Sequence, residues 1–199
     1  MARIIYKDGC DGHRRLEYIE GIEIDLLNGQ KALIYPKYSK EALLDMKDRD
    51  RWHDVGVSEI AAFRLTDNQA STSTLLEAGS PAARFVTQFT SERFGRFGLP
   101  TMLAALEMTD QKGEIDNLAR GIEGADLLES FYSGVWSCSR CNQDYGWIAS
   151  GGGGYAGSYG LGFKYVAVPL VLLDTAADAF KKRTAGSVAP QGVRAELPF

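Results

Sequence analysis

The chain of 199 residues contains few cysteines and no excess of basic residues, which are features of several common functional classes of protein. It holds only three cysteines, too few for a disulfide framework, and a domain of this size does not need one for stability. Basic residues are outnumbered, with 22 lysines and arginines against 26 aspartates and glutamates. The resulting net charge of −4 leaves no basic field to hold a phosphate backbone, so we expect no nucleic-acid partner.

Long apolar runs are also missing. No run approaches the roughly 18 residues needed to span a bilayer, so we expect no membrane insertion. The first residues lack the apolar region and the small-residue cleavage site of a signal peptide. The expected location is therefore the cytoplasm or an assembled virion.

Hydrophobic residues make up 45% of the chain, which is enough for one substantial core. We expect a single domain over residues 1–174. Residues 175–199 are small, polar and interrupted by glycine and proline, which is typical of a C-terminal tail.

Local patterns predict an α+β fold. Residues 22–35 alternate in polarity around Asn28-Gly29, a pair typical of the two-residue type I′ turn of a β-hairpin. Ser80-Pro81 predicts the start of a helix, and Thr101 or Pro100 predicts the start of a second helical region. Residues 37–56 favour a short helix and a loop, and residues 66–81 favour a loop.

The pattern changes after Leu128. Short aromatic and β-branched runs alternate with glycine-rich pieces, which indicates strands joined by loops. The predicted architecture is an N-terminal hairpin, two helices, and a strand- and loop-rich C-terminal third with a mixed or antiparallel sheet.

Two short motifs suggest a metal site. Cys10-x-x-His13 and Cys138-x-x-Cys141 contain all three cysteines and one of the two histidines, and four such ligands could form a tetrahedral zinc site. A zinc-stabilised structural or interaction domain is therefore the alternative function, and small buried cysteines are the simpler interpretation. A redox role is disfavoured, because redox pairs lie at helix N-termini and this one follows a predicted strand.

Catalytic patterns are not found in the sequence. There is no G-x-S-x-G motif, and only His13 and His53 are available as bases. The run "SGGGGYAGSYGLG" fits a phosphate-loop pattern through its composition alone, and a strand rather than a helix is predicted after it. We therefore expect no enzyme and no cofactor.

The same run has the composition of a binding surface. Tyr155 and Tyr159 would supply amphipathic contact area, and the serines and glycines around them would supply adaptability, as in antibody paratopes. A flexible loop without a partner is the other interpretation.

A series of motifs resembles a known family. "GIEID", "NGQKALI", "SPAARFVTQF", "FGLPT", "EIDNL", "VWSCS", "YGWIAS" and "KYVAVPLVLL" follow one another over residues 21–173. In this order they resemble the C-type-lectin-like domains of gut bacterial and phage proteins of unknown function. Phe97-Gly98 stands where the family has tryptophan before its L-P-[ST] motif, and Cys138 replaces a serine.

The resemblance implies that the chain ends share one sheet and that loops between the late strands form an exposed face. The calcium-binding triplets of sugar-binding lectins are not present, so calcium-dependent sugar binding does not carry over. The chain is also similar to the variable proteins of diversity-generating retroelements, whose mutagenised codons encode a ligand-binding face.

This similarity implies a framework that contains Trp136, Gln143 and Trp147. The ligand-binding residues it implies are exposed and changeable: Ser139, Arg140, Asn142, Asp144, Tyr145, Ser150, Tyr155, Ser158 and Tyr159. The expected partner is a protein or glycan ligand on a surface. Homo-oligomerisation is a further expectation, since displayed binders gain from avidity.

Overall fold

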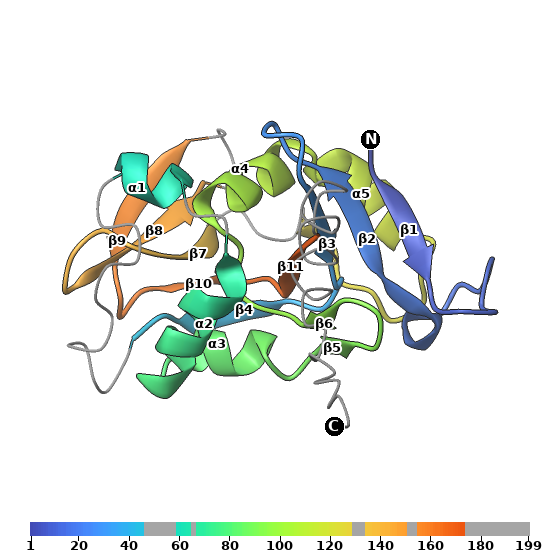
Figure 1. Ribbon diagram of the computed structural model, residues 1–199, viewed down its shortest axis with the longest axis horizontal. Helices are drawn as coiled ribbons and strands as arrows, with labels where there is room; N and C mark the ends of the chain where they lie inside the picture. The colour runs from blue at the N-terminus through green and yellow to red at the C-terminus, as the bar shows by residue number, and fades with distance from the viewer. Residues whose placement is uncertain (46–58, 65–66, 129–133, 151–154, 174–199) are drawn as a thin grey trace, which may run out of the picture.

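The computed structural model describes residues 1–45, 59–64, 67–128, 134–150 and 155–173. These residues form helices and two main sheets, which confirms the α+β class (Figure 1). His53 and the expected tail 175–199 lie outside the described residues. Within the described ranges, no helix is long and apolar enough to cross a membrane.

The first sheet has four antiparallel strands in the order β1-β2-β3-β11. Its strands are β1 (Arg3–Tyr6), β2 (Ile19–Asp25), β3 (Lys31–Ile34) and β11 (Leu170–Leu173). β1 and β11 occupy its two edges, so the first and last described strands belong to one sheet. A short helix, η1 (Leu16–Tyr18), precedes β2.

The predicted β2–β3 hairpin is confirmed, but its turn differs from the two-residue type. Asp25 pairs with Lys31, and the Leu26 N–H donates to the Gln30 carbonyl oxygen at 2.8 Å, which leaves a three-residue loop. Gly29, in this loop, has a left-handed backbone with φ of 78°. Three-residue loops with one left-handed glycine are among the commonest hairpin loops after the two-residue type.

The second sheet is mixed and has the order β4-β10-β7-β8-β9. Its strands are β4 (Ser39–Leu43), β10 (Lys164–Ala167), β7 (Val135–Arg140), β8 (Tyr145–Ala149) and β9 (Ala156–Gly160). β10 runs parallel to β7, and the other neighbours are antiparallel. A separate two-stranded ribbon joins β5 (Thr90–Ser91) to β6 (Gly95–Arg96).

Strand β4 corrects the prediction of a helix after residue 37. Ala42 and Leu44 are buried, whereas Lys40 and Glu41 are exposed, and the strand pairs with β10. Pairing and burial here outweigh the local helical propensity of the sequence "KEALL". Residues 46–56 of the same prediction lie outside the described residues.

Two predicted helix starts are confirmed. The Ser80 hydroxyl accepts from the Ala83 N–H before α3 (Pro81–Val86), and the Thr101 hydroxyl accepts from the Ala104 N–H before α4 (Met102–Asp110). These side chains satisfy backbone donors that the first helical turn leaves unpaired. α5 (Lys112–Ala119) follows, and α1 (Glu59–Arg64) precedes them in the chain.

The predicted loop 66–81 is wrong, because it contains helix α2 (Asn68–Glu77). The Asp67 carboxylate accepts from the N–H groups of Gln69 and Ala70, both at 3.0 Å, and starts the helix. Thr72 and Thr74 donate their hydroxyl groups to carbonyl oxygens four residues earlier. The polar composition that suggested a loop is therefore accommodated inside a helix.

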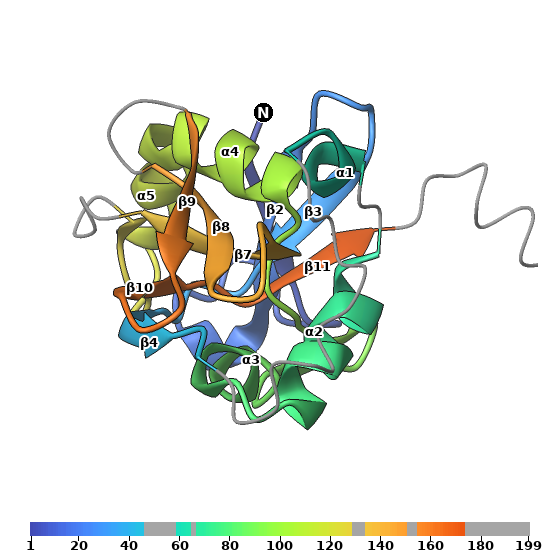
Figure 2. The ribbon, with the colours of Figure 1, turned by 90° about the vertical axis from the view of Figure 1, so that its left-hand side faces the viewer.

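The helices lie on two sides of the sheets. Figure 2 shows α4 and α5 on one side and α2 and α3 on the other. Ala104 and Met108 of α4 pack with the four-stranded sheet, and Leu75 of α2 and Val86 of α3 pack against the five-stranded sheet around Trp136.

Asn68 links these layers. Its side-chain amide is 1% exposed and donates to the carbonyl oxygens of Leu99 and Leu170, at 3.0 and 2.8 Å. A Cβ on Gly98 would lie 2.7 Å from the Thr72 hydroxyl oxygen, so only glycine fits at this crossing without rearrangement. Helix α2 is thereby fixed against β11.

Candidate functional site

The predicted site residues begin in the β7–β8 hairpin. Asn142 and Asp144 are exposed in its turn, where the Asn142 Oδ1 atom accepts from the Asp144 N–H at 2.9 Å. Tyr145 follows at the start of β8 and is 45% exposed. These three residues are accessible, as expected.

Ser139 corrects the prediction of an exposed site, because it is fully buried. Its N–H donates to the Ser137 hydroxyl oxygen at 3.2 Å, and the Ser137 hydroxyl donates to the Trp147 carbonyl oxygen at 2.9 Å. β7 lies between two strands and has helices on both faces, so its side chains have little access to solvent. Arg140, at the end of β7, is half-buried.

The described end of the glycine-rich segment forms strand β9, residues 156–160, where a loop was predicted. β9 pairs along its whole length with β8, from Ala156 opposite Ala149 to Gly160 opposite Tyr145. The Ser150 N–H also donates to the Tyr155 carbonyl oxygen at 2.9 Å. Residues 151–154 lie outside the described part of the chain.

Strand alternation divides the predicted surface between two faces of the sheet. Successive side chains of a strand point to opposite faces, so Tyr155 and Tyr159 lie on one face and Ser158 lies on the other with its partner Trp147. A Cβ on Gly157 would lie 3.0 Å from the Tyr159 ring and 3.9 Å from the Tyr155 ring, which places all three on the same face.

Tyr159 is connected to the core through a series of aromatic contacts. The Trp136 and Tyr165 rings meet edge to face with centroids 5.0 Å apart, and Tyr165 meets Tyr159 at 5.1 Å. Tyr159 then contacts Phe163 at 6.4 Å. Burial raises the pKa of Tyr165, so its hydroxyl group is neutral at physiological pH.

We use the name aromatic ridge for the exposed surface at the outer end of this series. It consists of Tyr159 and Phe163 from the series and of Tyr155, which lies on the same face of the sheet as Tyr159. Tyr155 is 57% exposed and Phe163 is 61% exposed. Sequence reasoning missed Phe163. A phenylalanine in the turn "GLGFK" before an apolar strand is a signal that could have found it.

The predicted framework residues differ in their environments. Trp136 is fully buried, and its indole N–H donates to the Ala42 carbonyl oxygen at 2.9 Å. Trp147 is half-buried, and its buried indole nitrogen has no hydrogen-bond partner among the described residues. Gln143 is exposed in the β7–β8 turn.

The four candidate zinc ligands are not brought together. All four lie in the described part of the chain, and no group of three or more metal-ligating side chains forms there. Cys138 is packed in the apolar cluster around Trp136, where burial raises the pKa of its thiol to about 12. That thiol is protonated at neutral pH, whereas zinc binds thiolate.

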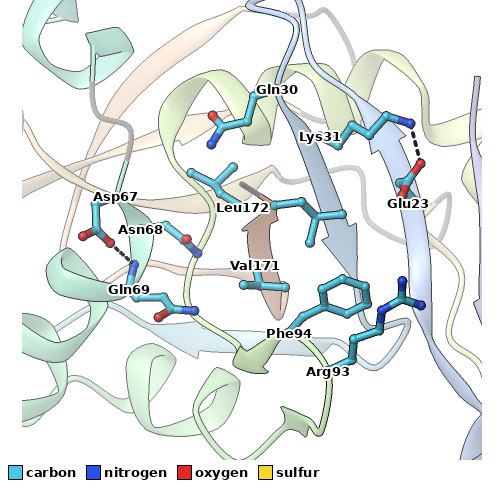
Figure 3. Close-up of a pocket in the computed structure, with 11 residues that line it drawn as sticks. Glu23, Gln30, Lys31, Asp67, Asn68, Gln69, Arg93, Phe94, Val171 and Leu172 are labelled. Carbon is cyan, nitrogen blue, oxygen red and sulfur yellow. Dashed lines mark hydrogen bonds and ion pairs between the residues drawn. The ribbon is translucent and has the colours of Figure 1, made fainter. Parts of the chain in front are cut away.

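A cavity that the sequence did not predict lies at β11, the start of α2 and the β5–β6 loop (Figure 3). Its volume is about 650 Å³, and none of the predicted site residues lines it. Phe94, Val171, Leu172 and Leu173 supply its apolar part, and its polar part includes Glu23, Gln30, Lys31, Asp67, Gln69 and Arg93. Residues from such distant segments form no sequence motif.

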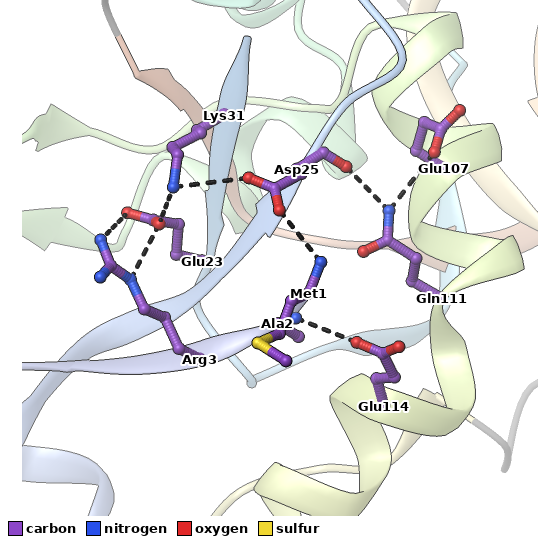
Figure 4. A network of polar contacts seen from close by, with 9 residues as sticks. All are labelled: Met1, Ala2, Arg3, Glu23, Asp25, Lys31, Glu107, Gln111 and Glu114. Atoms are coloured by element: carbon purple, nitrogen blue, oxygen red, sulfur yellow. Dashed lines mark hydrogen bonds and ion pairs between the residues drawn. The ribbon is translucent and has the colours of Figure 1, made fainter. Parts of the chain in front are cut away.

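The charges at one side of this cavity belong to a network around the N-terminus (Figure 4). Glu23 accepts from Lys31 at 2.6 Å and from Arg3 at 2.9 Å, and the N-terminal amine pairs with Asp25 at 3.0 Å. Burial alone would raise the pKa of Glu23, but the hydrogen bonds from Lys31 and Arg3 outweigh it and hold that pKa below its ordinary value.

Comparison of the chain with protein-family models, with curated proteins and with solved structures found no match.

The contact between Gly146 and the aromatic series yields one prediction. A Cβ at this position would lie 2.5 Å from the Leu44 Cδ2 atom and 3.0 Å from the Trp136 ring, and both residues are fully buried. We expect Gly146→Ala to lower the free energy of unfolding by about 1–2 kcal/mol through overpacking. Gly162→Ala is the matched control, because no atom lies within 4 Å of its Cβ. Equal urea midpoints for the two variants would contradict this packing.

The network around Glu23 yields a second prediction. Because the Glu23 pKa is lower in the folded than in the unfolded state, its contribution to stability is present above the unfolded value of about 4.3 and is lost as the pH falls through the folded value. We expect Glu23→Gln to lower the free energy of unfolding by about 1 kcal/mol at pH 7. The difference from the unmodified protein should become progressively smaller below pH 4.5.

Urea unfolding from pH 7 to pH 3 measures this difference. Glu41→Gln is the control, because the Glu41–Lys164 pair is exposed at both ends and should contribute less. A cost that does not depend on pH would show that the charge of Glu23 is not what stabilises the network.

Proposed function

We propose that this protein is a non-enzymatic ligand- or receptor-binding protein with a C-type-lectin-like fold. It binds a protein or glycan on a surface through the aromatic ridge. The observation that carries this proposal is the ring series, which begins at the buried Trp136 and ends at the exposed Phe163, with Tyr155 exposed on the same face as Tyr159.

The physical properties of the ridge suit binding. Aromatic side chains give large contact areas for the loss of few rotatable bonds, and they are enriched among the residues that dominate interface energies. Tyr159 is held by Tyr165 on one side and Phe163 on the other. A side chain that is already ordered loses less entropy when a ligand binds.

We include the exposed residues of the β7–β8 turn, Asn142 and Asp144, in the proposed surface. They lie at the end of the same sheet, next to β8, the strand adjacent to β9. Their polar groups are suited to adapt to different ligands. Tyr145, at the start of β8, shares the face of Trp147 and Ser158 and lies opposite the ridge. Ser139 is left out of this surface because it is buried.

The proposal can be tested with variants of the two most exposed ridge residues. The probes are a random dodecapeptide library displayed on phage and an immobilised glycan array, both selected on the unmodified protein. We expect Tyr155→Ala combined with Phe163→Ala to weaken the selected ligands at least tenfold, about 1.4 kcal/mol, because anchor area is removed.

The control removes apolar surface elsewhere. Leu27 and Ile60 are 84% and 65% exposed, and Leu27→Ala combined with Ile60→Ala should leave binding unchanged. Ligands that bind both double variants as tightly as the unmodified protein would refute the role of the ridge.

We further propose that a retroelement diversifies this surface. The prediction is that the neighbouring DNA contains a reverse transcriptase gene and a near-copy of the region that encodes residues 138–164. The differences between the copies should fall at adenines and concentrate in codons for exposed residues such as Asn142 and Tyr155, leaving Trp147 unchanged. Sequencing of the locus checks this, and a locus without such a copy excludes diversification while leaving the binding proposal intact.

A further inference from the structure

The walls of the cavity at β11 are joined to one another by hydrogen bonds. The N–H and C=O groups of Gly98 both pair with Leu170, so the segment after the β5–β6 ribbon is joined to β11. The Gln69 side chain donates to the Arg96 carbonyl oxygen at 3.0 Å, which joins the ribbon to α2. The cavity is therefore preformed, and its volume of about 650 Å³ is within the range of small-molecule sites.

One wall of the cavity is apolar. Val171 is buried, and Phe94 and Leu173 pack in one cluster with it. Leu172 also lines the cavity (Figure 3). The turn that carries Phe94 is held by its own N–H, which donates to the Ser91 hydroxyl oxygen at 2.8 Å. This wall is suited to a hydrocarbon body, because removal of apolar surface from water is favourable.

Three of the four charged side chains that line the cavity are compensated within the protein. Lys31 and Glu23 pair with each other at 2.6 Å. The Asp67 carboxylate accepts from the N–H groups of Gln69 and Ala70 at the N-terminus of α2, where the helix dipole also favours a negative charge. These three side chains need no counterion from a ligand.

Arg93 is the fourth charged side chain, and it differs from the others. Its Cζ atom lies 5.1 Å from the centroid of the Phe94 ring, so the guanidinium stands beside the apolar wall (Figure 3). Within the part of the chain that the structure describes, no carboxylate forms an ion pair with it. Arginine presents planar donors that match the two oxygens of a carboxylate.

The other charges restrict the ligand to a single negative charge. Two carboxylates, Glu23 and Asp67, and two cations, Lys31 and Arg93, line the cavity, so the lining has no net charge. A dianion such as a phosphate monoester would be only half neutralised by Arg93 and would be repelled by the two carboxylates. A carboxylate carries the one charge that Arg93 can neutralise.

We propose that this cavity is a second ligand site, which takes a small amphipathic carboxylate. The apolar body of the ligand lies against Phe94, Val171 and Leu172, and the Arg93 guanidinium binds its carboxylate. No residue of the aromatic ridge lines the cavity. This inference therefore goes beyond the proposed binding function and does not depend on it.

Octyl compounds supply matched probes, because they share one apolar body and differ in the headgroup. Octanoate carries the carboxylate, octanamide carries a neutral group of similar shape, and octyl phosphate is a dianion. Each is titrated into the full chain, and two-dimensional amide NMR reports both the location and the dissociation constant. We expect octanoate to shift the amide resonances of Phe94 and Leu172 and to bind at least tenfold more tightly than the other two.

Two variants test the role of the guanidinium. Arg93→Gln removes the charge and keeps most of the side-chain length, so it should weaken octanoate at least tenfold and change octanamide less than threefold. Arg84→Gln is the matched control, because Arg84 is exposed on α3 and does not line the cavity. It should change octanoate binding less than threefold. Both arginines are exposed, so both variants should fold.

The possible results are distinct. Resonances of Phe94 and Leu172 that do not respond to millimolar octanoate overturn the inference, as does an Arg93→Gln variant that binds octanoate as tightly as the unmodified protein. Octanamide or octyl phosphate that binds as tightly as octanoate overturns the assignment of a carboxylate. Octanoate binding that is unchanged in the Tyr155→Ala, Phe163→Ala double variant supports a site separate from the ridge, and its loss there overturns that separation.

Discussion

The placement of Trp136 is the constraint on which the rest of the site depends. Its indole N–H binds the Ala42 carbonyl oxygen, so it links β7 to β4 across β10. Its ring supports Tyr165, which in turn supports Tyr159. The same residue thus fixes the interior of the five-stranded sheet and the position of the aromatic ridge, and small changes beside it affect both stability and the exposed surface.

The ridge and the outer edge of β9 follow from one structural fact, which is that residues 156–160 are paired with β8. Pairing places Tyr155 and Tyr159 on one face and directs the backbone of Ala156 and Ser158 outward. A loop of the same composition would have neither property. Binding through the ridge would therefore use aromatic side chains that a paired strand holds in place.

The sequence predicted the elements whose signals are local. The β2–β3 hairpin and the caps Ser80 and Thr101 rest on neighbouring residues, and the structure confirms them. Prediction from the sequence failed for features that depend on contacts between distant segments of the chain. α2 contains residues that favour loops, but Asp67 caps it and Leu75 is buried. The burial of Ser139 depends on the neighbours of β7 in the sheet, and the cavity at β11 joins segments far apart in the chain.

The central claim is that residues 156–160 form a strand paired with β8 and thereby present the ridge. Solution NMR tests it directly, because residues opposite each other in a pair that shares no hydrogen bond bring their Hα atoms close together. The account predicts a nuclear Overhauser effect between the Hα atoms of Trp147 and Ser158, and another between those of Ala149 and Ala156. Random-coil shifts over residues 155–160 with neither effect would contradict it.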